Sequence, residues 1–134
     1  MDEFSDPCEK RVAEDIDDIA PDGSEVRLLC RASRGSMAHF RLPAGTVARA
    51  VQHRSVEEVW FVVAGRGEIW RDSQGAGSVT ELEPGLSLTI PTGVSFQFRA
   101  IGKEALEIVG VTMPPWPSGE DEAVPVTGHW PPTG

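Results

Sequence analysis

The feature that most constrains the fold is a series of short, strand-like segments separated by turns rich in glycine and proline. Within residues 37–42 the apolar side chains Ala38, Phe40 and Leu42 alternate with more polar ones, as expected for a half-buried strand. The expected strands cover residues 25–30, 37–42, 47–53, 58–63, 67–71, 79–82, 86–90, 96–100 and 106–112. Many short strands with regular turns predict an all-β sandwich or barrel.

Length and composition limit the possible functions. A chain of 134 residues can bury one core, and a hydrophobic fraction of 40% is that of a soluble globular protein. No apolar run approaches the roughly 20 residues that a membrane span needs, so no membrane partner is expected. The formal net charge of -9 argues against a nucleic-acid partner, because such binding uses clustered Lys and Arg.

The start of the sequence, MDEFSDPCEKRVAEDIDD, is acidic and lacks the apolar stretch of a signal peptide, so a cytoplasmic location is expected. Two cysteines, Cys8 and Cys30, do not make a disulfide framework, and no closely spaced cysteine pair indicates a zinc site. Cys30 lies in an apolar, strand-like run, which favours its role as a small core residue.

Three segments are expected along the chain. Residues 1–22 form an acidic N-terminal arm, which ends at the turn signal Pro21-Asp22-Gly23, and residues 23–113 form the barrel. Residues 114–134 form a tail rich in proline that carries two large apolar side chains, Trp116 and Trp130. We expect this tail to pack against the barrel or against a neighbouring subunit.

Two stretches of the sequence share the spacing of a known pair of motifs. The first reads GTVARAVQHRSVEEVWFVVAG and the second reads GLSLTIPTGVSFQFRA. Together they resemble the paired signature motifs of the cupin superfamily. The matching positions are Gly45, His53, Glu58 and Gly65 in the first motif and Gly85, Pro91 and Gly93 in the second.

This resemblance implies a double-stranded β-helix, the all-β jelly-roll barrel of RmlC-like cupins. Small single-domain cupins with motifs of this kind are often described as similar to mannose-6-phosphate isomerase. A sugar substrate does not follow from the resemblance, because similar barrels serve enzymes, storage proteins and sensor domains.

The resemblance also implies a metal-ligand set of three histidines and one glutamate, and this chain departs from it. His53 and Glu58 are retained, whereas Val51 and Phe96 occupy the positions of the other two histidines, and Ala100 replaces the closing asparagine of the second motif. Catalytic metal sites usually present at least three protein ligands. We therefore predict no metal ligands and no cofactor, with a divalent metal held weakly at His53 and Glu58 as the alternative.

Other residues could complete a metal site only if they faced the barrel interior. Strand alternation places His39 opposite Phe40 and turns Gln52 away from the face of His53. His129 lies in the tail. We interpret His39 and His129 as structural or surface residues.

Strand alternation also predicts which side chains surround His53 and Glu58, because every second residue points to the same face. The predicted ligand-binding residues are Val51, Trp60, Val62, Phe96 and Phe98. A pocket with these apolar walls, one imidazole and one carboxylate suits a small molecule with a large apolar or planar part and one or two polar groups. The aromatic side chains equally suit a hydrophobic core.

The His53–Glu58 pair has two interpretations. The two side chains can satisfy each other in a half-buried polar contact without any chemistry. Alternatively they are catalytic, with Glu58 orienting and charging His53, which then exchanges a proton with the ligand.

Three functions remain open from sequence: a small-molecule-binding cupin without a tightly bound metal, an enzyme, or a filled barrel kept for dimerisation. The enzyme would be a metal-free isomerase or cyclase using His53 and Glu58, or a weak metal enzyme. The strand around Phe61 is apolar on both faces, and only one face can fill the barrel. A second sheet, the Trp116 segment or a partner subunit could cover the other face, and the resemblance to small cupins favours a homodimer.

Overall fold

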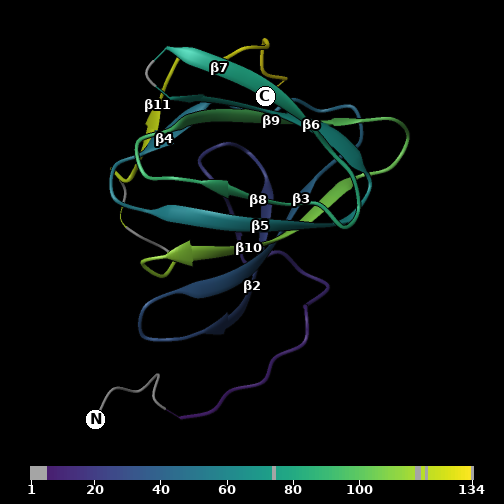
Figure 1. Ribbon diagram of the computed structural model, residues 1–134. Helices are drawn as coiled ribbons and strands as arrows, with labels where there is room; N and C mark the ends of the chain where they lie inside the picture. The colour runs from purple at the N-terminus through teal and green to yellow at the C-terminus, as the bar shows by residue number, and fades with distance from the viewer. Residues whose placement is uncertain (1–5, 74, 117–118, 120, 134) are drawn as a thin grey trace.

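The computed structural model describes residues 6–73, 75–116, 119 and 121–133, and this described part forms eleven strands and no helix. The six-stranded sheet has the order β1 (Asp18–Ile19), β2 (Glu25–Arg31), β3 (Ser36–Leu42), β10 (Leu106–Met113), β5 (Glu57–Ala64), β8 (Ser87–Ile90). The five-stranded sheet has the order β11 (Ala123–Pro125), β4 (Val51–His53), β9 (Ser95–Ile101), β6 (Arg66–Ser73), β7 (Ala76–Leu82). The two sheets face each other as the two walls of a barrel (Figure 1). The predicted all-β jelly-roll is confirmed.

One hydrophobic core fills the space between the sheets. In β3 the predicted alternation is confirmed, because Ala38, Phe40 and Leu42 are buried while Met37 on the other face is exposed. Burying each large side chain of this kind contributes about 1.5–3 kcal/mol. Among the described residues no helix could span a membrane, in keeping with the absence of helices there.

The strand predicted over residues 47–53 is shorter than expected, since only Val51–His53 forms β4. The preceding backbone makes its hydrogen bonds with several separate segments instead of one ladder. The Ala48 amide donates to the carbonyl of Phe98, and the next amide, of Arg49, donates to the carbonyl of Asp22. Strands β1 and β11 are short edge strands that the sequence pattern did not indicate.

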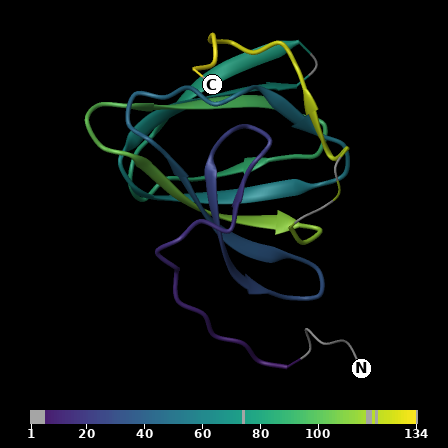
Figure 2. The same cartoon turned by 180° about the vertical axis from the view of Figure 1, so that it is seen from behind.

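The first described residues of the arm and the last part of the tail lie on opposite walls of the barrel, whereas residues 20–22 and Trp116 approach the same mouth. The purple N-terminal arm runs beneath the six-stranded sheet, and the yellow tail lies over the five-stranded sheet (Figures 1 and 2). The tail is held by Gln97, whose side chain donates to the carbonyl of Trp130 at 2.7 Å and accepts from the amides of His129 and Trp130. Division of the chain into an arm, a barrel and a tail as separate units stays a prediction.

The prediction that Cys30 is a core residue is wrong. Its side chain is half-buried and lies against Cys8 of the arm, with 3.1 Å between the two sulfur atoms. The physical reason is a register irregularity in the pairing of β2 with β3 between Leu28 and Arg31, which interrupts the simple alternation of buried and exposed side chains.

Candidate functional site

His53 and Glu58 lie at one mouth of the barrel, on either side of the short connection between β4 and β5. His53 ends β4, and Glu58 is the second residue of β5. The distance from His53 Nε2 to Glu58 Oε2 is 3.1 Å, and the two side chains are only 10% and 5% exposed. The chain reversal thus brings an imidazole and a carboxylate into contact in a nearly water-free position.

A second carboxylate, from the tail, faces the other side of the imidazole. Glu122 Oε1 lies 3.5 Å from His53 Nδ1 and accepts hydrogen bonds of 2.7 Å from the amides of Ser55 and Val56. Its Oε2 accepts from the Ser55 hydroxyl at 2.7 Å. Glu122 therefore fastens the tail to the β4–β5 connection and places His53 between two carboxylates.

A third carboxyl group, from the N-terminal arm, borders the same space. Asp22 is buried and accepts hydrogen bonds from the amide and the hydroxyl of Ser24, at 2.9 and 2.7 Å. Burial raises the pKa of Asp22, and the nearby charge of Glu58 adds to the effect, although the bonds from Ser24 oppose it. The site therefore combines one imidazole with three carboxyl groups.

The electrostatics of the site favour a charged imidazole. Burial acts to lower the pKa of His53, but the hydrogen bond and charge of Glu58 outweigh it, and Glu122 and Asp22 add to the rise, so the net pKa is raised. For Glu122, burial acts to raise the pKa, but the bonds from Ser55 and Val56 and the charge of His53 lower it overall. His53 can therefore hold a proton at a pH where a free imidazole would lose it.

Aromatic side chains support the pair from inside the barrel. Phe96 stacks on the His53 ring with 5.9 Å between centroids, and Trp60 donates from Nε1 to Glu58 Oε1 at 3.2 Å. Trp60 also packs edge-on against Phe96 and Phe98. These contacts fix both polar side chains in place.

The space beside the pair is very small. A cavity of about 20 Å³ is bordered by His53, Glu58, Trp60 and Val51, and is covered by residues 20–22 of the arm and by Trp116 and Ala123 of the tail. This volume is about that of one water molecule. Phe96, Phe98 and Val62 are buried in the core around it. The sequence suggested a pocket for a molecule with a large apolar or planar part, with a filled barrel as an alternative, and the cavity beside the pair has room for about one water molecule.

His53 Nδ1 is buried and has no hydrogen-bond partner within the described part of the chain. Its neighbour Glu122 Oε1 lies at 3.5 Å and already accepts two backbone amides. Buried polar atoms without partners are uncommon in native proteins and call for an explanation such as a water or a ligand. This nitrogen is the atom of the site that is open to a further hydrogen bond.

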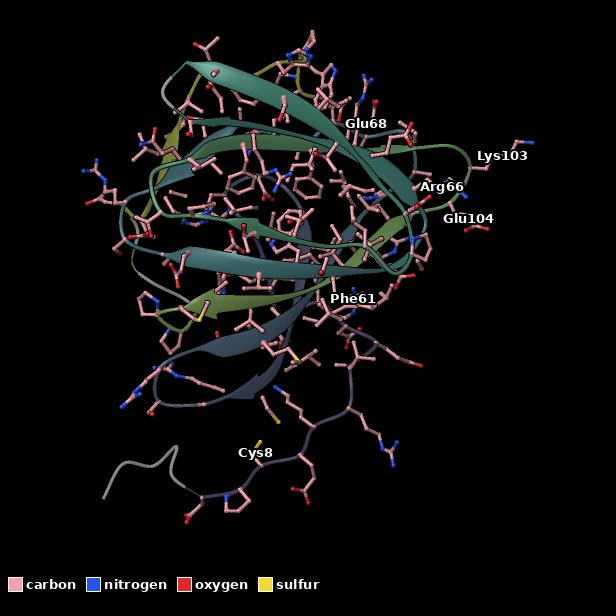
Figure 3. All side chains as sticks on the ribbon, viewed as in Figure 1. Cys8, Phe61, Arg66, Glu68, Lys103 and Glu104 are labelled. Carbon is pink, nitrogen blue, oxygen red and sulfur yellow. The ribbon has the colours of Figure 1, made fainter. Side chains whose placement is uncertain are left out.

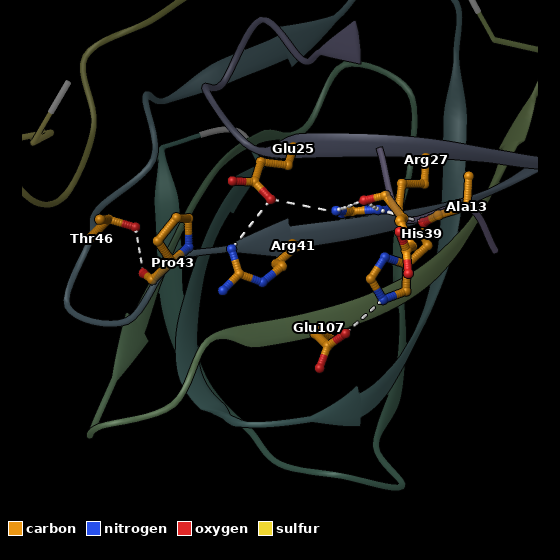
Figure 4. A network of polar contacts seen from close by, with 9 residues as sticks. Ala13, Glu25, Arg27, His39, Arg41, Pro43, Thr46 and Glu107 are labelled. Atoms are coloured by element: carbon orange, nitrogen blue, oxygen red, sulfur yellow. Dashed lines mark hydrogen bonds and ion pairs between the residues drawn. The ribbon is translucent and has the colours of Figure 1, made fainter. Parts of the chain in front are cut away.

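The metal chemistry that the cupin resemblance implies does not fit these residues. Val51 and Phe96 are cross-strand partners in the β4–β9 ladder and are both buried, so hydrocarbon occupies the two positions. His53 directs its two nitrogens toward different carboxylates, and no group of three or more His, Cys, Asp or Glu in the described residues could hold a metal ion. His39 pairs instead with Glu107 at 2.9 Å on the outer face (Figure 4).

Comparisons with known proteins agree with the fold. The sequence profile described as "Cupin domain" matches residues 38–112, so the chain belongs to the cupin family. An uncharacterized protein of Methanocaldococcus jannaschii is 27% identical over 111 residues, which cover 79% of this chain and 85% of that protein.

Two solved structures show the same fold at low sequence identity. KdgF from Halomonas sp. is 18% identical, with a TM-score of 0.63 over 75% of this chain and 88% of its own. A mutant of the Bacillus subtilis oxalate decarboxylase is 15% identical, with a TM-score of 0.70 over 91% of this chain but only 33% of its own. At these identities the likeness establishes the fold and no activity.

Sequence reasoning did not find Glu122 or Asp22. Glu122 stands in an acidic stretch of the tail, Gly119 to Ala123, where no periodicity distinguishes one acid from the next. Asp22 stands in a turn, where an aspartate ordinarily needs no explanation beyond the turn itself. Only the folding of both chain ends onto the same barrel mouth brings these carboxyl groups to His53.

Proposed function

We propose that this protein is a small-molecule-binding cupin without a tightly bound metal, and that its site is the His53–Glu58 pair. The observation that carries the proposal is the buried His53–Glu58 pair on the wall of a small covered cavity, and His53 Nδ1 also lacks a hydrogen-bond partner among the described residues. Keeping charged groups inside a barrel is costly, and apolar residues of similar size would often be as stable. Ionisable groups in such surroundings are frequent at functional sites.

The charges around His53 indicate the class of ligand. The raised pKa of His53 favours a charged imidazole between Glu58 and Glu122, and with the carboxyl group of Asp22 nearby the site has a surplus of acceptor oxygens. A neutral or cationic molecule fits this balance if its hydroxyl or amino groups donate hydrogen bonds to the carboxylates and a hydroxyl oxygen accepts one from the Nδ1–H group of His53. An anionic ligand would meet repulsion from the carboxylates.

Entry of a ligand larger than water requires the cover to move. Trp116 borders the cavity from the tail, and its backbone amide donates a 2.7 Å hydrogen bond to the Ser36 hydroxyl oxygen. Because Trp116 is a single large side chain of the cover, Trp116→Ala should open the site without removing any polar group of it. The matched control is Trp130→Ala, since Trp130 packs against Arg99 away from the cavity.

The test is a binding screen with neutral polyols, amino alcohols and small carboxylic acids, followed by native mass spectrometry and thermal shift. We expect binding of neutral or amine-bearing compounds, tighter in Trp116→Ala than in Trp130→Ala, and weakened at least tenfold by His53→Phe. If no compound binds to the parent chain or to Trp116→Ala, the closed barrel is a scaffold and the proposal fails.

The second candidate is an acid/base enzyme that uses the same pair, and the raised pKa of His53 favours it. Glu58→Gln removes the charge that contributes most to this rise, so the pKa of His53 should fall in an NMR titration. Glu57→Ala is the control, because Glu57 is exposed and lies on the other face of β5. Turnover of a bound compound that Glu58→Gln abolishes would distinguish catalysis from binding.

We also propose that the protein is a homodimer built on the outer face of β5. Val59, Phe61 and Val63 are 41%, 47% and 42% exposed and share one face of β5, so they form an apolar strip along this strand. Figure 3 labels Phe61, the middle residue of the strip. In a two-fold symmetric dimer the strip would pack against its own copy. Sedimentation should show a dimer at tens of micromolar and a monomer for Phe61→Glu, whereas a monomeric parent would contradict this.

The cytoplasmic location stays a prediction.

A further inference from the structure

The two cysteines of the chain meet at the outer edge of the barrel. Cys8 lies on the arm (Figure 3) and Cys30 on β2, 22 positions apart. Their sulfur atoms are nevertheless 3.1 Å from each other. Cys30 Sγ also donates to the backbone carbonyl of Cys8 at 3.4 Å. We propose that Cys8 and Cys30 form a reversible disulfide that ties the N-terminal arm to β2.

The surroundings allow a small oxidant to reach this pair. Cys8 is exposed and Cys30 half-buried, and both border an open hollow of about 470 Å³ together with Arg34, Met37 and Met113. Because Cys8 is exposed to solvent, its sulfur is accessible to a low-molecular-weight disulfide such as oxidised glutathione. Accessible thiols with a second cysteine beside them are the usual sites of reversible oxidation.

The reaction is an ordinary thiol–disulfide exchange in two steps. The Cys8 thiolate attacks one sulfur of the small disulfide, so a mixed disulfide forms and one small thiolate leaves. The Cys30 thiolate then attacks Cys8 Sγ, which forms the Cys8–Cys30 bond and releases the second thiolate. Two protein thiols are oxidised, one small disulfide is reduced to two thiols, and the two protein protons go to the leaving thiolates.

The Cys8–Cys30 disulfide would attach the arm to β2 at a second place, in addition to its contacts with Arg27. Arg27 of β2 donates from Nε to the carbonyl of Ala13 at 2.9 Å and from Nη2 to that of Glu14 at 2.8 Å (Figure 4). These contacts hold the middle of the arm. A disulfide at Cys8 would add a covalent attachment near its start and close a loop that contains Lys10 and Arg11.

In the decisive experiment the full chain is equilibrated in glutathione buffers of defined redox ratio, and the free thiols are then alkylated. Intact mass spectrometry and a non-reducing peptide map identify the disulfides that have formed. We expect an intramolecular Cys8–Cys30 disulfide, seen as a loss of about 2 Da, for the removal of two hydrogens. The effective concentration of the two thiols should exceed by at least tenfold the roughly millimolar value of a flexible tether.

The matched control carries Cys8→Ser together with Glu9→Cys. It keeps two thiols at almost the same separation along the sequence, but one of them no longer occupies the position that contacts Cys30. Its effective concentration should be at least tenfold lower than that of the parent. The proposal is overturned if the parent and the control are equal, or if the parent forms only glutathione adducts or disulfides between chains.

A second readout tests the tie itself. Trypsin should cut after Lys10 and Arg11 at least tenfold more slowly in the oxidised parent than in the reduced parent. Cys30→Ser, treated in the same buffers, should show no such difference. Equal cleavage of the oxidised and reduced parent would show that the bond does not restrain the arm.

Discussion

The two ends of the chain are attached to the barrel in different ways. The tail is held by Gln97, which is 1% exposed and bonds to His129 and Trp130, and by the half-buried Glu122, which bonds to the β4–β5 connection. The first part of the arm is held on the outer surface, by Arg27 and by the contact between Cys8 and Cys30. Figure 2 shows the two ends on opposite walls.

The two attachments differ in the free energy that is lost when they break. Breaking a buried polar contact leaves its partners without hydrogen bonds, at a cost of about 1–3 kcal/mol each. Breaking an exposed contact lets water replace the lost partner, and the cost is usually below about 1 kcal/mol. The tail is thus part of the cooperative fold and closes the candidate site, whereas the start of the arm can detach without unfolding the barrel.

The largest effect is expected from Gln97→Ala. This change leaves the carbonyls of Ala48 and Trp130 and the amides of His129 and Trp130 without their buried partner, so we expect a loss of about 3 kcal/mol in the free energy of unfolding. Urea denaturation measures it. The control is Gln52→Ala, because Gln52 is half-buried and accepts one bond, of 3.3 Å, from Ser95. Equal losses in both variants would mean that the tail is not held through Gln97.

A smaller effect, of about 1 kcal/mol at neutral pH, is expected from Glu122→Gln, since the amide keeps an acceptor oxygen but loses the charge. Glu122 has a lowered pKa in the folded chain, so its charge stabilises the fold above its ordinary pKa of about 4.3 and stops doing so as the pH falls through the folded pKa. The difference between parent and variant should therefore shrink in acid, as measured by denaturation at several pH values.

The same variant affects His53 with the opposite sign. His53 has a raised pKa, so its contribution to stability is complete below about pH 6.5 and is lost as the pH rises through the folded pKa. Removing the Glu122 charge should lower the His53 pKa in an NMR titration. An unchanged His53 pKa in the Glu122→Gln variant would mean that the tail does not contribute to the electrostatics of the site.

The smallest effect is expected from Arg27→Met. Global stability should fall by less than about 1 kcal/mol, because the lost contacts lie near the surface. Amide exchange within residues 8–17 should nevertheless accelerate at least tenfold in the reduced protein. Arg41→Met is the control, since Arg41 pairs with Glu25 at 3.2 Å and this contact involves no residue of the arm (Figure 4). A large global loss from Arg27→Met would place the arm in the cooperative fold.

The sequence alone determined the barrel and the position of its polar pair. Alternation in residues 37–42 and in β5 predicted which side chains are buried, because a strand presents every second residue to the same face. The spacing of Gly45, His53, Glu58 and Gly65 carried the resemblance to the cupin family, to which the chain belongs. These features are local, and local patterns are visible in a sequence.

Only the tertiary structure decided what surrounds that pair. Glu122 and Asp22 come from the two ends of the chain and meet at His53 because both ends fold over one barrel mouth. The size of the cavity depends on how Trp60, Trp116 and their neighbours pack, and packing between distant segments leaves no periodic signal. The contact of Cys8 with Cys30 likewise arises because the arm returns along β2, which brings together two positions that the sequence separates.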